Sequence, residues 1–249
     1  MHKFGYIPDA LDFRDFNYGA VVDTTRKLPK AVDLTNLMPS VYHQGNSSSC
    51  VAQSVAAAMY YNFVKNNVTP ENLSRLFIYY NTRAMENSID LDQGCQIRNA
   101  IKSVANIGAP NEKLWPFIPV RYKDKPVQKA YDHAKTNLVS SYSRVNQNLY
   151  ELKYCLASGY PVVFGIAVYT SFTFSTVEKT GIVYLPKKGE KLLGGHAIVL
   201  TGYDDNTKRF TFRNSYGTSW GNKGYGTISY DYVTSQNLAD DFWVIKNVL

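Results

Sequence analysis

The first half of the chain carries apolar residues at the three- and four-residue steps of amphipathic helices. The clearest helix is predicted from Cys50 to about Lys65, where alanines add to the helical tendency. Ser48 and Ser49, just before it, are candidate N-caps. Its apolar stripe is formed by Val51, Val55, Ala58, Met59 and Phe63. Further helices are predicted near residues 73–84, 95–106, 127–138 and 148–158.

Beyond Pro161 the pattern changes to short runs of β-branched and aromatic residues, which favour strands. Asp204, Asp205 and Asn206 predict a turn between two of these strands. Because helices fill the first half and strands the second, we expect an α+β fold with two lobes rather than a doubly wound sheet. The predicted strands are Val162–Val168, Gly181–Leu185, Ala197–Tyr203, Arg209–Arg213, Tyr225–Tyr230 and Phe242–Val248.

Composition is that of an ordinary globular protein, with 45% apolar and 19% charged residues among 249. This length suits one large domain or two closely packed lobes. The net charge of +7 comes from scattered basic residues, and the densest run, at residues 187–191, is a short loop. We interpret the charge as a solvated surface and predict no nucleic-acid partner.

The three cysteines, Cys50, Cys95 and Cys155, are too few and too far apart for a disulfide framework. Residues 1–12 lack the apolar run of a signal peptide, and no segment reaches the roughly 18 apolar residues of a membrane span. We therefore expect an intracellular protein with no membrane partner, or a virion protein if the source is a virus. The oligomeric state stays open.

Cys50 is the candidate nucleophile. A free cysteine on an alanine-rich helix is usually a small buried apolar residue. Cys50, however, lies at the first turn of its predicted helix, where free N–H groups and the helix dipole favour a thiolate and lower the thiol pKa. Cys155 lies within an apolar helical stripe and is predicted to serve packing, whereas the role of Cys95 is less clear.

His196 is the candidate base, because it opens a predicted strand after two glycines that leave room for a substrate backbone. If the following turn centres on Asp205, His196 lies opposite Asn214 across the hairpin, and a bulge would shift this pairing by one residue. Cross-strand neighbours have Cβ atoms about 4.5–5.5 Å apart, so an amide at that position can orient the imidazole ring. A thiol, an imidazole and an amide are the components of a nucleophilic acyl-transfer site.

Gln44 is the candidate oxyanion donor, six residues before Cys50 in a run of small polar residues. A compact loop there would place its amide beside the backbone N–H of Cys50, so that both donate to one developing oxyanion. The alternative is that Gln44 and Gly45 form only a turn.

These segments resemble the papain family of cysteine peptidases. The resemblance rests on residues 28–34, on Gln44 to Cys50, on Gly195-His196-Ala197 with Gly202-Tyr203, and on residues 214–221 followed by Gly224-Tyr225. The Cys50-to-His196 separation also fits that family. The resemblance implies a peptidase domain over residues 28–249. It further implies a helical left lobe carrying Cys50, a β-barrel-like right lobe carrying His196 and Asn214, and an active site in the cleft between them.

By the same resemblance, Gly94, Cys95, Gly195 and Asp240 are expected to bind substrate, with Asp240 or Asp241 at the floor of the main specificity pocket. The family's aromatic residue after the nucleophile is replaced by Val51, its shielding tryptophan by Tyr216, and its first disulfide cysteine by Ser47. These departures resemble the disulfide-poor branch found in bacteria and large DNA viruses.

The main functional hypothesis is a cysteine endopeptidase acting on peptides or proteins through a thioester. A catalytically inactive papain-fold binding protein remains an alternative because of Val51 and Tyr216, although inactive members usually lose the Cys, His or Asn that this chain keeps. An acyl transferase remains another, because it uses the same site as a hydrolase. No organic cofactor is implied, and the Cys and His spacings suit no zinc site.

Residues 1–27 form an irregular lead-in interrupted by Gly5, Pro8 and Gly19. Because large apolar groups left in water are costly, we expect it to dock. It is either a strap packed on a lobe, which we favour, or a shortened prosegment across the cleft. Seven such groups lie between residues 4 and 18: Phe4, Tyr6, Ile7, Leu11, Phe13, Phe16 and Tyr18.

Overall fold

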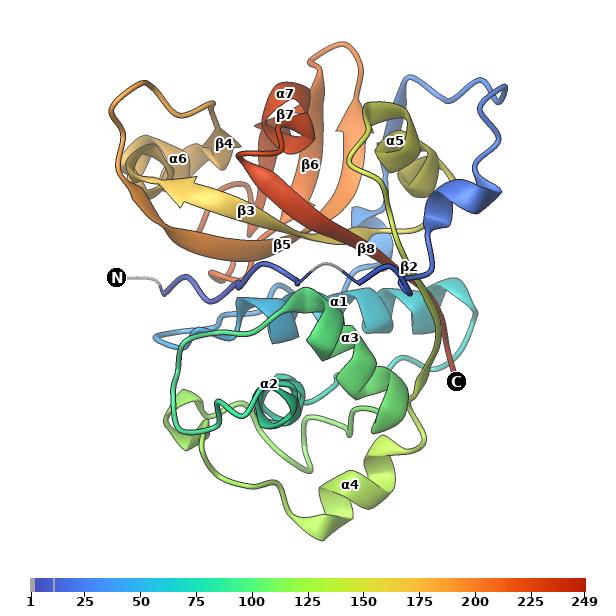
Figure 1. Cartoon of the computed structure of the whole chain (residues 1–249), viewed down its shortest axis with the longest axis vertical. Coiled ribbons are helices and arrows are strands. Elements are labelled where there is room, and N and C mark those ends of the chain that lie inside the picture. The colour runs from blue at the N-terminus through green and yellow to red at the C-terminus, as the bar shows by residue number, and fades with distance from the viewer. Residues whose placement is uncertain (1–2, 11) are drawn as a thin grey trace.

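The computed structural model describes residues 3–10 and 12–249; Leu11 of the lead-in therefore lies outside the described residues. The chain folds into a helical lobe and a sheet lobe, with the first residues running between them (Figure 1). The helical lobe comes from the first half of the chain and the sheet lobe from the second, as the segregation of patterns predicts. The two-lobe α+β fold is confirmed.

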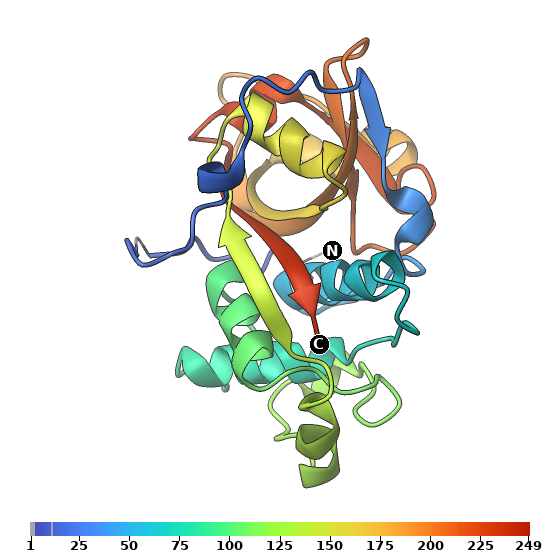
Figure 2. The same cartoon turned by 90° about the vertical axis from the view of Figure 1, so that its right-hand side faces the viewer.

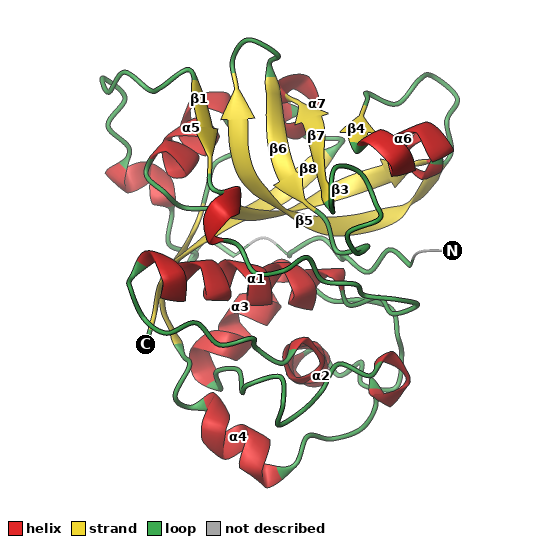
Figure 3. Ribbon diagram, turned by 180° about the vertical axis from the view of Figure 1, so that it is seen from behind, coloured by secondary structure: helices red, strands yellow, loops and turns green. Residues whose placement is uncertain are grey.

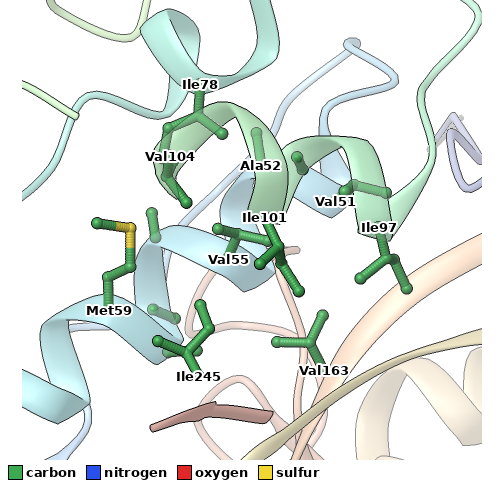
Figure 4. Packing of buried hydrophobic residues seen from close by; sticks show 14 of the residues in the cluster. Val51, Ala52, Val55, Met59, Ile78, Ile97, Ile101, Val104, Val163 and Ile245 are labelled. Atoms are coloured by element: carbon green, nitrogen blue, oxygen red, sulfur yellow. The ribbon is translucent and has the colours of Figure 1, made fainter. Parts of the chain in front are cut away.

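The helical lobe contains four α-helices in the described chain: α1 (Cys50–Lys65), α2 (Arg75–Met85), α3 (Ile97–Asn106) and α4 (Gln128–Ala134). α1 lies at the lobe interface and contacts both β5 and β8 of the sheet lobe. Helices buried on all sides are apolar all round. The small side chains of Ala56, Ala57 and Ala58 let neighbouring elements approach closely, and Val55, Met59 and Ile101 fill the space between them (Figure 4).

The sheet lobe is one curved, open sheet (Figure 3). Its strand order is β2-β8-β3-β5-β6-β7-β4, with β1 also paired to β5, and all described pairs are antiparallel except β4–β7. The strands are β1 (Ala31–Asp33), β2 (Val139–Arg144), β3 (Val162–Tyr169), β4 (Ile182–Val183), β5 (Leu192–Asp204), β6 (Arg209–Arg213), β7 (Tyr225–Ser229) and β8 (Ala239–Val248).

Short helices complete the sheet lobe and the connections. They are α5 (Leu149–Ala157), α6 (Ser175–Thr180) and α7 (Tyr230–Thr234), with 3₁₀ turns at Tyr18–Val21, Thr35–Leu37, Pro119–Arg121 and Thr170–Thr173. β2 and β8 run side by side from the sheet lobe towards the helical lobe (Figure 2). These paired strands therefore link the lobes.

The five predicted helices are present, and most of their ends agree within two residues. Ser49 is the N-cap of α1, but its side chain makes no capping hydrogen bond and instead accepts one from Gln53. The strand predicted at Gly181–Leu185 is wrong in extent. Gly181 ends α6 in the left-handed region with φ 69°, and only Ile182–Val183 pair as a strand.

The described part of the lead-in has two portions. Residues 3–9, here called the cleft strand, lie between the lobes (Figure 1). Residues 15–27, here called the strap, follow the sheet lobe: Arg144 donates its backbone N–H to Phe16, and Tyr18 is buried against Tyr154. Phe13 between the portions is fully exposed and Phe16 is 74% exposed, so not every aromatic group of the lead-in is buried.

In the described residues, no helix is long and apolar enough to cross a membrane.

Candidate active site

Cys50 lies at the first residue of α1, and its side chain is fully buried. Its sulfur accepts a hydrogen bond from the backbone N–H of Ala197, at 3.5 Å. Ala197 follows His196 in β5, so the packing of α1 against this strand brings the thiol to the imidazole. The candidate nucleophile and the candidate base thus come from different lobes and meet at the lobe interface.

His196 and Asn214 are hydrogen-bonded, with 2.8 Å between His196 Nε2 and Asn214 Oδ1. The Asn214 oxygen also accepts from the backbone N–H of Ser215, which fixes its orientation. Because Oδ1 is an acceptor, it favours the proton on Nε2 and leaves Nδ1 as the basic nitrogen. This is the arrangement that a general base of the cysteine needs.

The register predicted for the hairpin, with a turn centred on Asp205, is wrong, although His196 and Asn214 are hydrogen-bonded. The turn spans residues 205–208, and the strands pair Asp204 with Arg209 and Leu200 with Phe212, with a register shift at residues 200–202. His196 lies inside β5 rather than at its start, and Asn214 lies just beyond β6. The two side chains therefore meet although the residues are not a regular cross-strand pair.

Aromatic rings enclose the imidazole. Tyr216 stacks on His196 with ring centroids 4.9 Å apart, and Phe172 approaches its edge at 6.1 Å. Trp220 contacts both of these aromatic residues. Tyr216, which stands where the family has a tryptophan, therefore covers the fully buried His196 imidazole.

Gln44 is fully buried and rigidly held. Its Oε1 accepts from the Ser215 hydroxyl at 2.6 Å, and its Nε2 donates to the carbonyl oxygens of Ser47 at 2.7 Å and Lys3 at 3.1 Å. Lys3 belongs to the cleft strand. One N–H of Gln44 therefore already faces a carbonyl oxygen in the cleft, as an oxyanion donor must.

The cleft strand binds the walls of the cleft through its backbone. Cys95 N–H donates to the Gly5 carbonyl at 2.9 Å and Ile7 N–H donates to the Cys95 carbonyl at 3.1 Å, which makes a parallel bridge. Tyr6 N–H donates to the Gly195 carbonyl at 2.9 Å. A Cβ on Gly94 would lie 1.9 Å from the Gly5 oxygen, so only glycine admits this backbone. Three of the four predicted substrate-binding residues therefore contact the cleft strand.

A pocket of about 330 Å³ adjoins the cleft and contains Tyr6. The Tyr6 hydroxyl donates to Asp241 at 2.6 Å. Burial raises the pKa of Tyr6, so this hydroxyl remains a donor. Asp240, the fourth predicted substrate-binding residue, lines the pocket with a side chain 57% exposed, whereas the Asp241 side chain is fully buried and is reached through the Tyr6 hydroxyl. Gly165 leaves room for the Tyr6 ring, since a Cβ there would lie 2.1 Å from it.

The thiol of Cys50 is not activated in this arrangement. Burial raises its pKa to about 11, while hydrogen bonds from the backbone of Ala197, Gly5 and Val51 partly lower it. The sequence predicted a lowered thiol pKa at the helix start. Desolvation exceeds this effect because the cleft strand covers the sulfur.

Several residues at the site were not predicted from the sequence. Asp9 next to the cleft, its partners Arg98 and Arg144, and Phe172 beside His196 come from segments far apart in the chain. His43 accepts a hydrogen bond from Gly45 N–H and so shapes the Gln44 loop. The three cysteines are buried free thiols, and the described residues contain no group of three or more metal-ligating side chains.

A sequence model described as papain family cysteine protease matches residues 28–247. The chain belongs to this family and is a papain-like cysteine peptidase. It is 39% identical over 272 residues to an uncharacterized peptidase C1-like protein of Acanthamoeba polyphaga mimivirus, an alignment that covers 99% of this chain and 87% of that protein.

Solved structures agree with this family assignment. The structure is similar to that of xylellain, a cysteine protease from Xylella fastidiosa, with a TM-score of 0.93, 39% identity, and coverage of 99% of this chain and 96% of that one. Digestive procathepsin L 3 of Tenebrio molitor shares the fold, with a TM-score of 0.70, 18% identity, and coverage of 89% and 71%. The bacterial and viral relatives confirm the branch that the sequence resembles.

Proposed function

We propose that this peptidase is a cysteine endopeptidase that uses Cys50, His196, Asn214 and Gln44, and that its own cleft strand keeps it latent. The observation that carries the catalytic part is the junction of α1 and β5, where the thiol, the imidazole and the orienting amide meet. The Nε2 of Gln44 supplies a donor beside them.

The reaction follows from these positions. His196 takes the thiol proton, and the Cys50 sulfur attacks the substrate carbonyl carbon. Gln44 Nε2–H and the Cys50 backbone N–H stabilise the oxyanion. When the C–N bond breaks, His196 gives the proton to the leaving amine and a thioester remains. Water activated by His196 then attacks the thioester, which releases the acid and restores the thiol.

The latent state is supported by three contacts of the cleft strand. Tyr6 lies in the wall of the pocket with its hydroxyl bound to Asp241, Gly5 lies on the Cys50 sulfur, and the Lys3 carbonyl accepts the Gln44 N–H that faces the cleft. The Gly5 carbonyl oxygen faces Cys95 rather than Gln44, so the residue on the sulfur is not presented for attack. A substrate therefore has to displace this strand. The lead-in combines both predicted roles, with a blocking cleft strand and a strap.

The pocket also supports a substrate preference. Once Tyr6 leaves, the buried Asp241 carboxylate loses its hydroxyl donor. A long side chain with a donor at its end, such as Tyr, Lys or Arg, would replace that bond. The substrates are then peptides or unfolded proteins, and the three free thiols fit a reducing compartment.

Four full-length proteins test the proposal: wild type, Tyr6→Ala, Cys50→Ala and the double variant. Removing the buried Tyr6 ring weakens docking by about 1.5–3 kcal/mol, which should raise turnover of an unfolded protein substrate roughly 10- to 100-fold. Internal cleavage, read by mass spectrometry, identifies an endopeptidase. Both Cys50→Ala proteins should be inactive.

Other outcomes would contradict the proposal in distinct ways. A folded Tyr6→Ala protein that reacts with an epoxide thiol inhibitor at Cys50 but cleaves nothing would be an inactive binding protein. Products carrying an added amine instead of a new carboxylate would identify a transferase. Equal turnover by wild type and Tyr6→Ala would overturn the latent state while leaving the peptidase.

A further inference from the structure

The cleft strand inserts a carboxylate into a site that already holds charged groups. Asp9 has no exposed side-chain surface, and neither has Asp241, whereas Arg144 is 24% exposed. Arg98 lies beside them but is occupied, because it binds both carboxylate oxygens of Asp15 on the strap. A single guanidinium, that of Arg144, therefore serves the two fully buried carboxylates.

Hydrogen bonds hold Asp9 in place without neutralising it. Its Oδ2 accepts from Trp243 Nε1 at 2.9 Å, and its Oδ1 accepts from the backbone N–H of Arg98 at 3.1 Å. The backbone N–H of Asp9 donates to Asp241 at 2.6 Å, which keeps the two carboxylates close. Arg144 Nη1 lies 3.3 Å from Asp9, and its Nη2 contacts Asp241. The titratable groups facing Asp9 are thus Tyr6, Asp15, Arg98, Arg144, Asp240 and Asp241.

Charge balance differs between the docked and open states. With the cleft strand displaced, Asp9 returns to water, Arg98 pairs with Asp15 and Arg144 with Asp241, and the remaining carboxylate, Asp240, is 57% exposed and lies 3.6 Å from Arg144. Docking adds one negative charge to this enclosed cluster and brings no cation with it. Buried surplus charge is unfavourable, and a carboxylate escapes the penalty by binding a proton.

We propose that Asp9 is a proton-linked latch: docking of the cleft strand takes up a proton, so the cleft is held shut more tightly in acid and opens as the pH rises towards neutrality. This regulation rests on the proposed latent peptidase. It assigns to Asp9 a role that neither the catalytic residues nor the pocket requires.

The direction agrees with the titration of Asp9. Burial, and next the charge of Asp241, raise its pKa to about 6, against 3.8 for a free aspartate. The docked state therefore binds more protons than the open state between these values. Stabilisation of the docked strand is complete below 3.8 and is lost as the pH rises through about 6. A difference of about two pKa units corresponds to roughly a hundredfold change in the opening equilibrium.

Labelling of Cys50 in the full-length chain tests the latch. 2,2′-Dithiodipyridine forms a mixed disulfide with the exposed thiolate and releases thiopyridone, and it reacts from pH 4 to 8. Peptide mapping assigns the label, and the buried Cys155 reports any global unfolding. Rates proportional to reagent concentration report the opening equilibrium. Dividing the wild-type rate by that of Asp9→Asn removes the pH dependence of the thiol itself.

We expect this ratio to rise roughly a hundredfold between pH 4 and pH 7, since the amide of the Asp9→Asn variant does not titrate. Asp12→Asn is the matched control on the same lead-in. Asp12 pairs with Arg14 two residues away and lies 3.6 Å from Lys102 on α3; neither partner belongs to the Asp9 cluster, so this variant should keep the wild-type profile. If Asp9→Asn does not fold, Asp9→Ala takes its place, because either change removes the titrating group.

A ratio that stays flat, or that falls with pH, overturns the latch. The readout also separates this inference from the proposed function. If Cys50 labelling follows the expected pH profile but the Tyr6→Ala variant cleaves no peptide, the proposed peptidase activity is overturned and the latch remains. Cleavage by Tyr6→Ala together with a flat ratio overturns the latch alone.

Discussion

Gln44 has its two amide hydrogens committed in different directions. One donates to the Ser47 carbonyl within its own loop, and the other donates to the Lys3 carbonyl in the cleft strand. The Ser215 hydroxyl holds the opposite end of the amide. Displacement of the cleft strand therefore leaves one preorganised N–H directed into the cleft, which costs no rearrangement during catalysis.

Gln44→Ala, made in the Tyr6→Ala background, should lower kcat about 10²- to 10³-fold with little change in KM, because the lost donor acts on the oxyanion and not on the bound substrate. Steady-state kinetics with a fluorogenic peptide measure this split. Since Gln44 also holds Ser215, circular dichroism must show an intact fold. A rise in KM at constant kcat would assign Gln44 to substrate binding instead.

At the scale of elements, the sequence predicted the parts that local patterns control. The stripe of α1 and the position of Cys50 at its start follow from helical spacing, and β6 has the predicted bounds, Arg209–Arg213. β2 was not predicted, because Val139–Arg144 contains three serines and an arginine and acquires its strand only by pairing with β8. The hairpin register was missed because the turn at residues 205–208 is centred between Asn206 and Thr207 rather than on Asp205; the bulge at residues 200–202 then shifts the register once more.

Contacts between distant elements were the least predictable. Asp9 donates its backbone N–H to Asp241 across 232 residues, and nothing in an irregular lead-in distinguishes this aspartate from Asp12 or Asp15. The proximity of Cys50, His196 and Asn214 could be predicted from their residue types and order, whereas their catalytic roles stay a prediction. Their occlusion, and with it the raised thiol pKa, depends on the docked cleft strand.

Helix α3 secures the lead-in through one residue. Arg98 binds Asp15 on the strap, with side chains only 5% and 9% exposed, and also contacts the Ala10 carbonyl. Arg98→Ala leaves the buried Asp15 carboxylate with only the more distant Arg144, 3.8 Å away, and breaking a buried ion pair costs about 3–5 kcal/mol. We expect the melting temperature to fall by about 10 °C and Cys50 to label faster.

Lys102→Ala is the matched control on the same helix. Lys102 lies 3.6 Å from Asp12 and is 34% exposed, so its ion pair contributes about 0–1 kcal/mol. Differential scanning calorimetry measures the melting temperatures of both variants, and Arg98→Ala should show the larger decrease. Equal small losses would show that α3 does not anchor the lead-in.

At the scale of the whole molecule, the lead-in joins the lobes through two separable contacts. The cleft strand touches the helical lobe at Cys95 and the sheet lobe at Gly195. The strap instead follows the sheet lobe, where Tyr150 donates to the carbonyls of Asp23 and Arg26. Inhibition and stabilisation should therefore reside in different residues of one segment.

Two deletions separate these roles. Removing residues 1–9 takes away the cleft strand and should raise turnover, with a modest loss of stability from the buried Tyr6. Removing residues 1–26 should give the same turnover per folded molecule. It also exposes the surface that Tyr18 covers, at about 1.5–3 kcal/mol, so the melting temperature should fall by roughly a further 5–10 °C. Turnover normalised to titrated Cys50, together with thermal melting, measures both effects.

If the shorter deletion already causes the full loss of stability, the strap contributes nothing. If only the longer deletion raises turnover, inhibition resides in the strap rather than in the cleft strand.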